Sequence, residues 1–524
     1  MAFTWQQARE ELAERRQRAL GHGGEAAIAR QRKAGRMLLR ERIEYVADDG
    51  SFTEIGTMAV NRAKDAEGQE LPPTASAYLC GLATIDGRDV AIGGEDFTVN
   101  AGAAGHALDR SKGGMGGFIE DMAHEYKIPM IRSVEGAGGG VADQMEKGHA
   151  PLVSIYSFGP TFRLLGEVPL LTAALGPCAG AAGALVCASH FSVMSKDTAC
   201  LFAGGPPVVS RALGRRIDKF ELGGWEVHGK VSGVVDNVAE NEKDAMDQIR
   251  RVLSYLPQNV WELPPFVETD DPVDRRGEEL LKIIPENRRR PYQMQKVVDV
   301  IVDKGSFFEV GNAWARSLIT GFARIGGYVV GVIANNPMSL GGAFDGPAAQ
   351  KQTRFVELCD TFHIPLFFLV DVPGFMIGPA AEADGVLRKG TRAIQATMDT
   401  KVPIITVHVR KAYGMACNAT TNPDGLALRL AWPTAEWGDM PIEGGVEAGF
   451  RREIESAPDP EKRRAEIEER LLEQASPWYT AEAFGVEEMI DPAETRWYAW
   501  RFLKAAQGAL RTQLGPRERV GIRI

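Results

Sequence analysis

Short apolar runs and segments of helical spacing alternate along the chain. Apolar runs at residues 79–85 and 90–93 flank Asp86-Gly87, and a two-residue turn of this kind predicts a β-hairpin. The pattern continues with helical spacing at 117–126, a strand at 129–134, a glycine-rich stretch at 135–140 and a strand at 168–175. Strands that alternate with helices predict a layered α/β fold in which helices cover a sheet.

The second half of the chain repeats this pattern in the same order. Residues 50–56 recur at 305–311, residues 128–131 recur at 364–367, and the Val-Pro run before Gly180 recurs before Gly414, at offsets that shrink from 255 to 236 to 234. Insertions in loops change the spacing of two copies of one domain in this way. We therefore predict two α/β domains related by internal duplication. A stretch rich in Pro and Asp at 257–272 predicts the linker, and we place the domains at 1–265 and 266–524.

The flanking segments of both copies carry polar helical patterns. The spacing predicts an amphipathic helix at 4–20, a charged and exposed helical segment at 451–475, and a closing amphipathic helix at 497–510. Residues 25–45 are strongly basic, with Arg30, Arg32, Lys33, Arg36, Arg40 and Arg42. Two interpretations fit this basic segment, a solvated helix face or a contact with an anionic cofactor or a neighbouring subunit.

Composition limits the class of protein. The chain has 524 residues, of which 44% are hydrophobic and 25% charged, as in globular proteins of two or more domains. A net charge of −10 argues against nonspecific binding of nucleic acid. The six cysteines and eight histidines include no closely spaced pairs, so we predict no metal site. The polar start and the glycine-interrupted apolar runs predict neither a signal peptide nor a membrane segment, and hence a cytoplasmic protein.

Two glycine- and alanine-rich turns are the main candidates for chemistry. Gly176–Gly183 follows one apolar strand, and Arg410–Ala416 follows its repeat. Backbone amides that are exposed at such a turn can donate to a developing oxyanion. Close packing of a helix against a sheet is the alternative interpretation of each cluster. With no obvious nucleophile or strong base in the sequence, two amide clusters suit a reaction that stabilises an enolate and takes its base from a substrate or cofactor.

Other motifs have little support. Residues 224–230 approach the spacing of a P-loop, but Val231 stands where the magnesium-binding Ser or Thr would be. Neither a Gly-x-Ser-x-Gly elbow nor a His-Glu-x-x-His helix is present. Asp371 ends a continuous apolar strand and precedes Pro373 and Gly374, which is typical of a turn and also of the edge where α/β ligand sites open.

Many ordered motifs resemble one family over essentially the whole chain, the carboxyltransferase (beta) subunits of biotin-dependent acyl-CoA carboxylases, of the propionyl-CoA carboxylase beta type. These motifs lie at residues 176–180, 196–199, 222–224, 253–257, 336–338, 370–375, 410–414, 431–436 and 490–496. The resemblance implies two crotonase-like domains, a ring of subunits that is typically a hexamer, and active sites between domains of different subunits.

The resemblance also implies a reaction and its site residues. Carboxybiotin would release CO₂, the freed biotin nitrogen would take the α-proton of an acyl-CoA, and the thioester enolate would attack CO₂. The amino-terminal domain would bind acyl-CoA and the other would bind biotin. The implied oxyanion amides are Gly180, Ala181 and Ala182 for the thioester and Gly414, Met415 and Ala416 for biotin. The implied substrate-binding residues are Gly136, Ala137, Gly138 and Asn418, and the implied cofactor-binding residues are Pro373, Gly374, Phe375 and Tyr413.

The chain contains no Ala-Met-Lys-Met biotin-attachment motif and no ATP-binding glycine-rich loop. We therefore expect a partner, an alpha subunit with biotin carboxylase and biotin carboxyl carrier functions. Three alternatives stay open. They are the carboxyltransferase subunit of a biotin-dependent decarboxylase, a biotin-independent hydratase or hydrolase of the crotonase type, and a noncatalytic partner subunit.

The chain departs from the family pattern at both turns. The first reads Ala179-Gly180-Ala181-Ala182 where Ala-Gly-Gly-Ala is usual, and the second has Met415 where a second glycine is usual. The family's Asp-Ser-Gly-Gly-Ala-Arg loop appears as residues 135–140. In the family, the position of Asn418 helps to set acyl preference. An amide there either favours an acyl group with a polar atom or caps the turn at residues 422–424.

Overall fold

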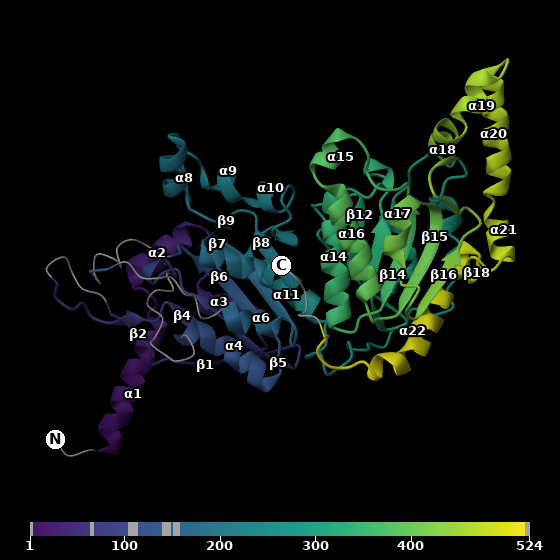
Figure 1. Ribbon diagram of the computed structural model, residues 1–524. Coiled ribbons are helices and arrows are strands. Elements are labelled where there is room, and N and C mark those ends of the chain that lie inside the picture. The colour runs from purple at the N-terminus through teal and green to yellow at the C-terminus, as the bar shows by residue number, and fades with distance from the viewer. Residues whose placement is uncertain (1–3, 63–67, 103–113, 139–147, 150–157, 519–524) are drawn as a thin grey trace. The chain divides into compact units, whose positions relative to one another are not determined.

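The computed structural model describes residues 4–62, 68–102, 114–138, 148–149 and 158–518 (Figure 1). The chain divides into two compact units. Among the described residues, unit 1 extends to Glu262 and also includes residues 516–518, and unit 2 is Leu263–Gly515. The division lies close to the boundary that we expect between residues 265 and 266, inside the stretch rich in Pro and Asp.

Unit 1 is built on one sheet of eight strands in the order β1-β4-β5-β6-β7-β8-β10, with β9 paired to β7. The strands are β1 (Thr53–Ile55), β4 (Tyr78–Ile85), β5 (Arg88–Glu95), β6 (Met130–Gly136), β7 (Leu170–Ala179), β8 (Phe191–Ser195), β9 (Cys200–Phe202) and β10 (Asn237–Ala239). The first three are antiparallel neighbours, and from β5 onward the pairing is parallel. A separate two-stranded ladder joins β2 (Val60–Asn61) and β3 (Thr74–Ala75).

Unit 2 repeats this topology strand for strand, in the order β11-β12-β13-β14-β15-β16-β18 with β17 paired to β15. Its strands are β11 (Phe308–Val310), β12 (Leu318–Ile325), β13 (Tyr328–Asn335), β14 (Leu366–Val372), β15 (Ile404–Tyr413), β16 (Ala427–Ala431), β17 (Glu436–Gly438) and β18 (Glu488–Met489). The prediction of an α/β fold with two crotonase-like domains related by internal duplication is confirmed.

Helices cover the sheets in both units (Figure 1). In unit 1 they are α1 (Trp5–Leu20), α2 (Glu25–Lys33), α3 (Leu39–Val46), α4 (Gly114–Tyr126), α6 (Phe158–Leu164), α7 (Ala181–Cys187), α8 (Pro206–Leu213), α9 (Lys219–Gly223), α10 (Trp225–His228) and α11 (Glu242–Leu253). In unit 2 they are α12 (Leu280–Ile283), α13 (Met294–Ile301), α14 (Gly346–Thr361), α15 (Pro379–Ala383), α16 (Val386–Asp399), α17 (Gly414–Cys417), α18 (Ile442–Gly449), α19 (Arg451–Ser456), α20 (Pro460–Gln474), α21 (Pro477–Glu482) and α22 (Thr495–Arg511). Short 3₁₀ turns are η1 (Asn100–Gly102), η3 (Leu340–Gly342), η4 (Asn418–Thr420) and η5 (Pro492–Glu494).

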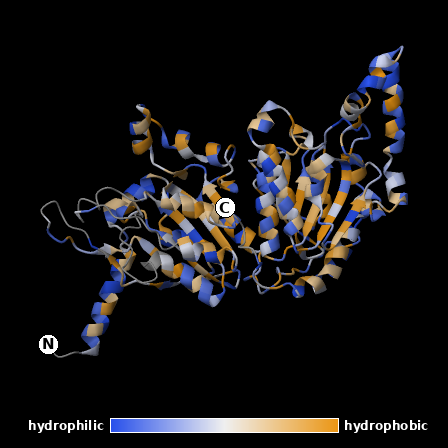
Figure 2. Ribbon diagram, viewed as in Figure 1, coloured by the Kyte–Doolittle hydropathy of each residue, from blue (hydrophilic) through white to orange (hydrophobic). Residues whose placement is uncertain are grey.

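Hydropathy follows this layering (Figure 2). The strands at the centre of each sheet are hydrophobic and almost entirely buried, as expected where helices cover a parallel sheet. The closing helix predicted at 497–510 is confirmed as α22, which buries Ala499, Leu503 and Leu510. The charged segment predicted at 451–475 forms α19 and α20, whose described side chains are exposed apart from a few such as Ile454 and Ile467.

Candidate active site

The first predicted turn joins the end of β7 to the start of α7. Gly180 has φ 59° and ψ −116°, a conformation that a side chain disfavours, so glycine is needed for the chain to reverse here. Ala181 is the first residue of α7, and the first amides of a helix have no partner within it. Ala181 and Ala182 therefore present their N–H groups at the end of the sheet.

The structure changes the role expected for Gly180. Its N–H donates to the carbonyl oxygen of Phe202 at 2.9 Å, which ties the turn to β9. Because the N–H of Gly180 already donates to another residue of the protein, the predicted oxyanion donors of this turn that remain are the N–H groups of Ala181 and Ala182. The contribution of Gly180 is its backbone conformation.

The loop that follows β6 packs directly against this turn. A Cβ on Gly136 would lie 3.4 Å from Cβ of Ala182, and a Cβ on Gly138 would lie 2.8 Å from the carbonyl oxygen of Ala179. The N–H of Ala137 donates to Ala101 in η1 at 2.9 Å. The structure thus brings Gly136, Ala137 and Gly138 together with the first turn.

A buried ionic cluster lies behind this loop. The carboxylate of Glu135 has no exposed surface and accepts hydrogen bonds from Arg36 and from Gln31 at 3.0 Å. Nη1 of Arg42 lies 2.8 Å from the same carboxylate, and Arg42 also pairs with Glu242 at 2.9 Å. Arg36 and Arg42 belong to the basic segment for which the sequence suggested a solvated face or an external contact. Their side chains are 12% and 1% exposed, so the interpretation as a solvated face is wrong for them.

The second predicted turn has the same construction at the end of β15. Gly414 has φ 60° and begins the short helix α17, which contains Met415 and Ala416. Tyr413 is 6% exposed, and its ring lies beside Gly438 in β17. The structure therefore places the implied biotin-side amides at the position in unit 2 that matches the first turn in unit 1.

The predicted cofactor-binding loop lies next to the second turn. A Cβ on Gly374 would lie 3.8 Å from the carbonyl oxygen of Tyr413. Gly374 accepts the N–H of Phe344 at 3.0 Å, and the rings of Phe375 and Phe344 stack at 5.8 Å. Pro373 is half-buried at the start of this loop, which is thus fixed to the framework of unit 2 while it borders the turn.

Asn418 follows the last residue of α17 as its C-cap and is exposed, with Nδ2 3.8 Å from Sδ of Met415. The following turn is capped by a different residue, because Oδ1 of Asn422 accepts the N–H of Asp424 at 3.0 Å. The alternative in which Asn418 caps that turn is therefore wrong. Met415 is 59% exposed, so both side chains stand at the surface beside the turn.

Burial changes the protonation of groups near the first turn. It raises the pKa of the Cys178 thiol, which leaves this strand-end cysteine unsuited to act as a nucleophile. Burial also raises the pKa of Glu95 and of Glu120 to about 7, although the neighbouring Arg132 acts in the opposite direction. Glu120 accepts from Arg132 and, at 3.1 Å, from Thr161.

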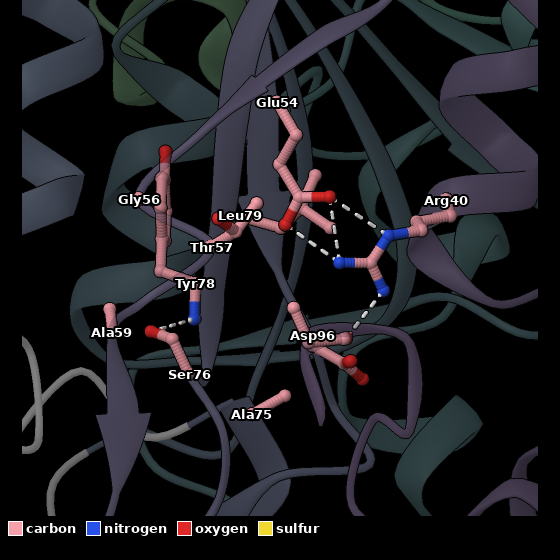
Figure 3. Close-up of a pocket in the computed structure, with 11 residues that line it drawn as sticks. Arg40, Glu54, Gly56, Thr57, Ala59, Ala75, Ser76, Tyr78, Leu79 and Asp96 are labelled. Carbon is pink, nitrogen blue, oxygen red and sulfur yellow. Dashed lines mark hydrogen bonds and ion pairs between the residues drawn. The ribbon is translucent and has the colours of Figure 1, made fainter. Parts of the chain in front are cut away.

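A small hollow of about 10 Å³ lies elsewhere in unit 1, between β1, β3 and β4 (Figure 3). Arg40 and Glu54 form a two-pronged ion pair at its wall, and Ser76 and Tyr78 also line it. The volume suits one water molecule and not a substrate. It contains none of the predicted site residues.

The described residues contain no group of three or more His, Cys, Asp or Glu side chains placed to hold a metal ion. None of the helices in the described part of the chain is long and apolar enough to cross a membrane.

Comparison with known proteins identifies the family. A model of the carboxyl transferase domain matches residues 30–520. The propionyl-CoA carboxylase carboxyltransferase subunit of Haloferax mediterranei is 37% identical over 500 residues, which cover 94% of this chain and 95% of that protein. The methylmalonyl-CoA decarboxylase subunit alpha of Veillonella parvula is 34% identical over 502 residues, covering 94% of each chain.

A solved structure agrees with this result. The transcarboxylase 12S hexamer, with methylmalonyl-coenzyme A and methylmalonic acid bound, matches with a TM-score of 0.88 at 32% identity and covers 99% of this chain and 98% of that chain. The chain therefore belongs to the carboxyl transferase family. The predicted resemblance is confirmed, and with it the class of enzyme, a carboxyltransferase of the acyl-CoA carboxylase type.

Proposed function

We propose that this chain transfers a carboxyl group between biotin on a partner carrier and the α carbon of a short acyl-CoA. The observation that carries the proposal is the pair of matching turns. Each unit has a glycine near φ 60° at the end of its central strand, followed by the first amides of a short helix. Carboxyl transfer through an enolate needs two such donor sites, one for the thioester oxygen and one for a ureido oxygen.

In unit 1, the N–H groups of Ala181 and Ala182 hold the thioester oxygen and stabilise the enolate that develops on it. Backbone donors at a fixed turn need no reorganisation as this charge develops. Gly136, Ala137 and Gly138 form the wall beside the acyl group, because they pack against the turn without side chains larger than a methyl group. We assign acyl-CoA binding to residues 1–265.

In unit 2, the turn of Gly414, Met415 and Ala416 suits a neutral ureido oxygen, since it offers backbone donors and no charged side chain of its own. Carboxylated biotin, when bound, supplies the carboxyl group and, after its release, the base that takes the α-proton. The bicyclic ring of biotin would be bordered at this turn by Pro373, Gly374, Phe375 and Tyr413. We assign the biotin side to residues 266–524.

The partner is an alpha subunit that carries biotin and carboxylates it, because this chain has no biotin-attachment motif. Assembly as a hexamer is supported by the hexameric structure to which the chain is similar. The reverse reaction, decarboxylation, is a second candidate, since one relative of 34% identity is a decarboxylase subunit.

We propose that Asn418 and Met415 set the acyl preference. Both are exposed at the second turn, and the amide of Asn418 would lose hydrogen bonds to water if a plain alkyl chain covered it. An acyl group with a hydroxyl or another polar atom would restore those hydrogen bonds.

The test combines the purified chain with a biotinylated carrier, a biotin carboxylase, ATP, bicarbonate and a panel of acyl-CoA thioesters. We expect carboxylated products only when the biotin protein is present. The reverse direction is followed with carboxylated thioesters and unloaded carrier. ATP-dependent carboxylation by the chain without any biotin protein, or no transfer in either direction with every thioester, would contradict the proposal.

A further inference from the structure

We propose that Glu135 and Asp371 are positioning residues for the two turns. Each carboxylate fixes a bulge in the neighbouring strand and thereby sets where the turn glycine and the amides after it point. The link to carboxyl transfer rests on the function proposed above, but the structural role of each carboxylate can be measured without it.

The two residues occupy the same place in their sheets. The register between β6 and β7 shifts, so that three residues of β7, 175–177, face Glu135 alone. The register between β14 and β15 shifts in the same way, so that residues 409–411 face Asp371 alone. The middle residues of these bulges are Gly176 and Arg410, and in both units the turn glycine follows four residues later.

In unit 2, Asp371 holds the bulge directly. Oδ1 accepts the backbone N–H of Lys411 at 3.2 Å, and Oδ2 accepts Nε of Arg410 at 3.1 Å. The hydroxyl of Tyr292 donates to Oδ2 at 2.9 Å, and Arg410 also donates to the carbonyl oxygen of Arg290 at 2.9 Å. Asp371 itself has no exposed surface. Two of the three bulge residues are thus bonded to one buried carboxylate.

In unit 1, Glu135 packs against Gly176, the middle residue of the bulge, through van der Waals contact. A Cβ on Gly176 would lie 2.3 Å from Oε1 of Glu135, so the carboxylate occupies the space that a side chain at 176 would need. The guanidinium groups come instead from Arg36 and Arg42, and Gln31 adds an amide donor. Helix α3 and the segment before it are therefore part of the support of the first turn.

The difference in cation source is the main argument for this role. If the carboxylate served only to neutralise a fixed cation, the cation would stand at the same position in both units. Instead the cations come from the bulge itself in unit 2 and from the amino-terminal segment in unit 1, while the carboxylate and the bulge stay together. Bulges next to active sites redirect the strand that carries them, which fits a strand that must end at an amide turn.

The test compares Asp371→Asn with Asp303→Asn. Asp303 is a buried carboxylate of the same unit that pairs with Arg496 at 2.6 Å and accepts two backbone N–H groups, from Gly326 and Gly327. Asp303 follows α13, and its carboxylate contacts the turn between β12 and β13 and not the glycine turn at the end of β15. Both substitutions remove one buried charge, and only the first is expected to disturb the second turn.

Hydrogen exchange measured by mass spectrometry is the primary readout. In Asp371→Asn we expect faster exchange in peptides that cover 409–417 and unchanged exchange in peptides that cover 173–187. Glu135→Gln is expected to do the reverse, and Asp303→Asn to change neither. Carboxyl transfer is expected to fall about 100-fold in the first two variants, as small misplacement of a catalytic group does. We expect most of this loss to appear in kcat for Asp371→Asn, because the amides that hold the thioester oxygen are assigned to unit 1.

A milder variant keeps the test decisive if Asp371→Asn fails to fold. Tyr292→Phe removes one donor to Asp371 and keeps the ring, and we expect about fivefold faster exchange in peptides that cover 409–417. Exchange of these peptides at the wild-type rate in the folded Asp371 and Tyr292 variants would overturn the proposal, as would an equal increase there in Asp303→Asn. Absence of transfer in the wild-type protein would instead overturn the proposed function and leave the exchange result valid.

Discussion

The two units share one topology but differ in what they bury beneath it. Unit 1 places Glu95 at the end of β5, Arg132 in β6 and Glu120 in α4, all nearly or fully buried. The equivalent positions of unit 2 hold Asn335 for Glu95, Phe368 for Arg132 and Val356 for Glu120. The matched strand registers and helix ends indicate these pairs. At these three positions the same fold thus accommodates a buried charged triad (Glu95, Glu120 and Arg132) in unit 1 and one polar and two apolar side chains in unit 2. What both copies retain is the strand-end carboxylate and the glycine turn.

Removal of the arginine next to each strand-end carboxylate should destabilise the protein to different extents. The arginines are Arg42 beside Glu135 and Arg410 beside Asp371. Arg42 is 1% exposed and contacts both Glu135 and Glu242, so Arg42→Met leaves two buried carboxylates short of a partner. We expect the free energy of unfolding to fall by about 3–5 kcal/mol, as for other broken buried pairs. For Arg410→Met we expect about 3 kcal/mol or less, because Nζ of Lys411 stays 3.4 Å from Asp371. Urea unfolding measures both, and equal losses would contradict the comparison.

The amide turns should respond alike if both take part in the reaction. Ala181→Pro removes one N–H at the first position of α7, where proline fits a helix. We expect kcat/KM to fall about 10²–10³-fold, the usual cost of one oxyanion donor. Met415→Pro tests the equivalent amide of unit 2 and should cost a similar factor.

Circular dichroism and the oligomeric state of both proline variants serve as controls for folding. Full turnover in a folded Ala181→Pro protein would show that this amide is not a donor. A loss in Ala181→Pro without a loss in Met415→Pro would break the functional equivalence of the two turns.

The buried carboxyl groups of unit 1 should make its stability depend on pH. Burial raises the pKa of Glu95 and of Glu120 to about 7, above the value near 4.5 expected in the unfolded chain. Between these values the folded state binds more protons than the unfolded state, so the free energy of unfolding decreases as pH rises from about 4.5 to about 7. We expect Glu95→Gln to make this decrease shallower.

Urea unfolding at several pH values measures this slope. Glu125→Gln is the matched control, because Glu125 is exposed on the same helix as Glu120 and its substitution should leave the slope unchanged. A slope in Glu95→Gln equal to that of the wild type would show that the charged triad does not distinguish unit 1 from unit 2.

The fold could be predicted because its signals are local and repeated. The Asp86-Gly87 turn between apolar runs predicts the β4–β5 hairpin, and the two Gly/Ala clusters at strand ends predict both turns. The offset between copies then predicts the duplication. None of these signals depends on contacts between distant residues.

The ionic support of the turns could not be predicted in this way, because it joins residues that are 39 to 104 positions apart in the sequence. Arg36 and Arg42 lie in a segment that is basic throughout, which favoured a solvated face. One signal was available, since Arg42 falls on the apolar stripe of α3 with Leu39, Ile43 and Val46. An arginine on a core-facing stripe indicates a buried partner, although not which one. The use of the Gly180 amide by Phe202 was also hidden, because it depends on how β9 pairs with β7.

The smallest effect that we expect concerns selectivity at the second turn. Asn418 corresponds to Ala184 in unit 1, and both positions are exposed just after their turns. If Asn418 contacts the acyl group, Asn418→Ile should raise kcat/KM for plain alkyl thioesters relative to hydroxyacyl thioesters by roughly 10-fold. In the variant, an alkyl chain covers an isoleucine and not an amide that would lose its hydrogen bonds to water. Ala184→Ile adds similar bulk at the matched position of unit 1. It should leave the order of kcat/KM among the thioesters unchanged, because Asn418 is retained. The measurement is kcat/KM for acetyl-, propionyl-, longer alkyl- and hydroxyacyl-CoA in the wild type and both variants. An unchanged ranking in Asn418→Ile would mean that this side chain does not select the substrate, and a shift in Ala184→Ile alone would move the selective position to unit 1.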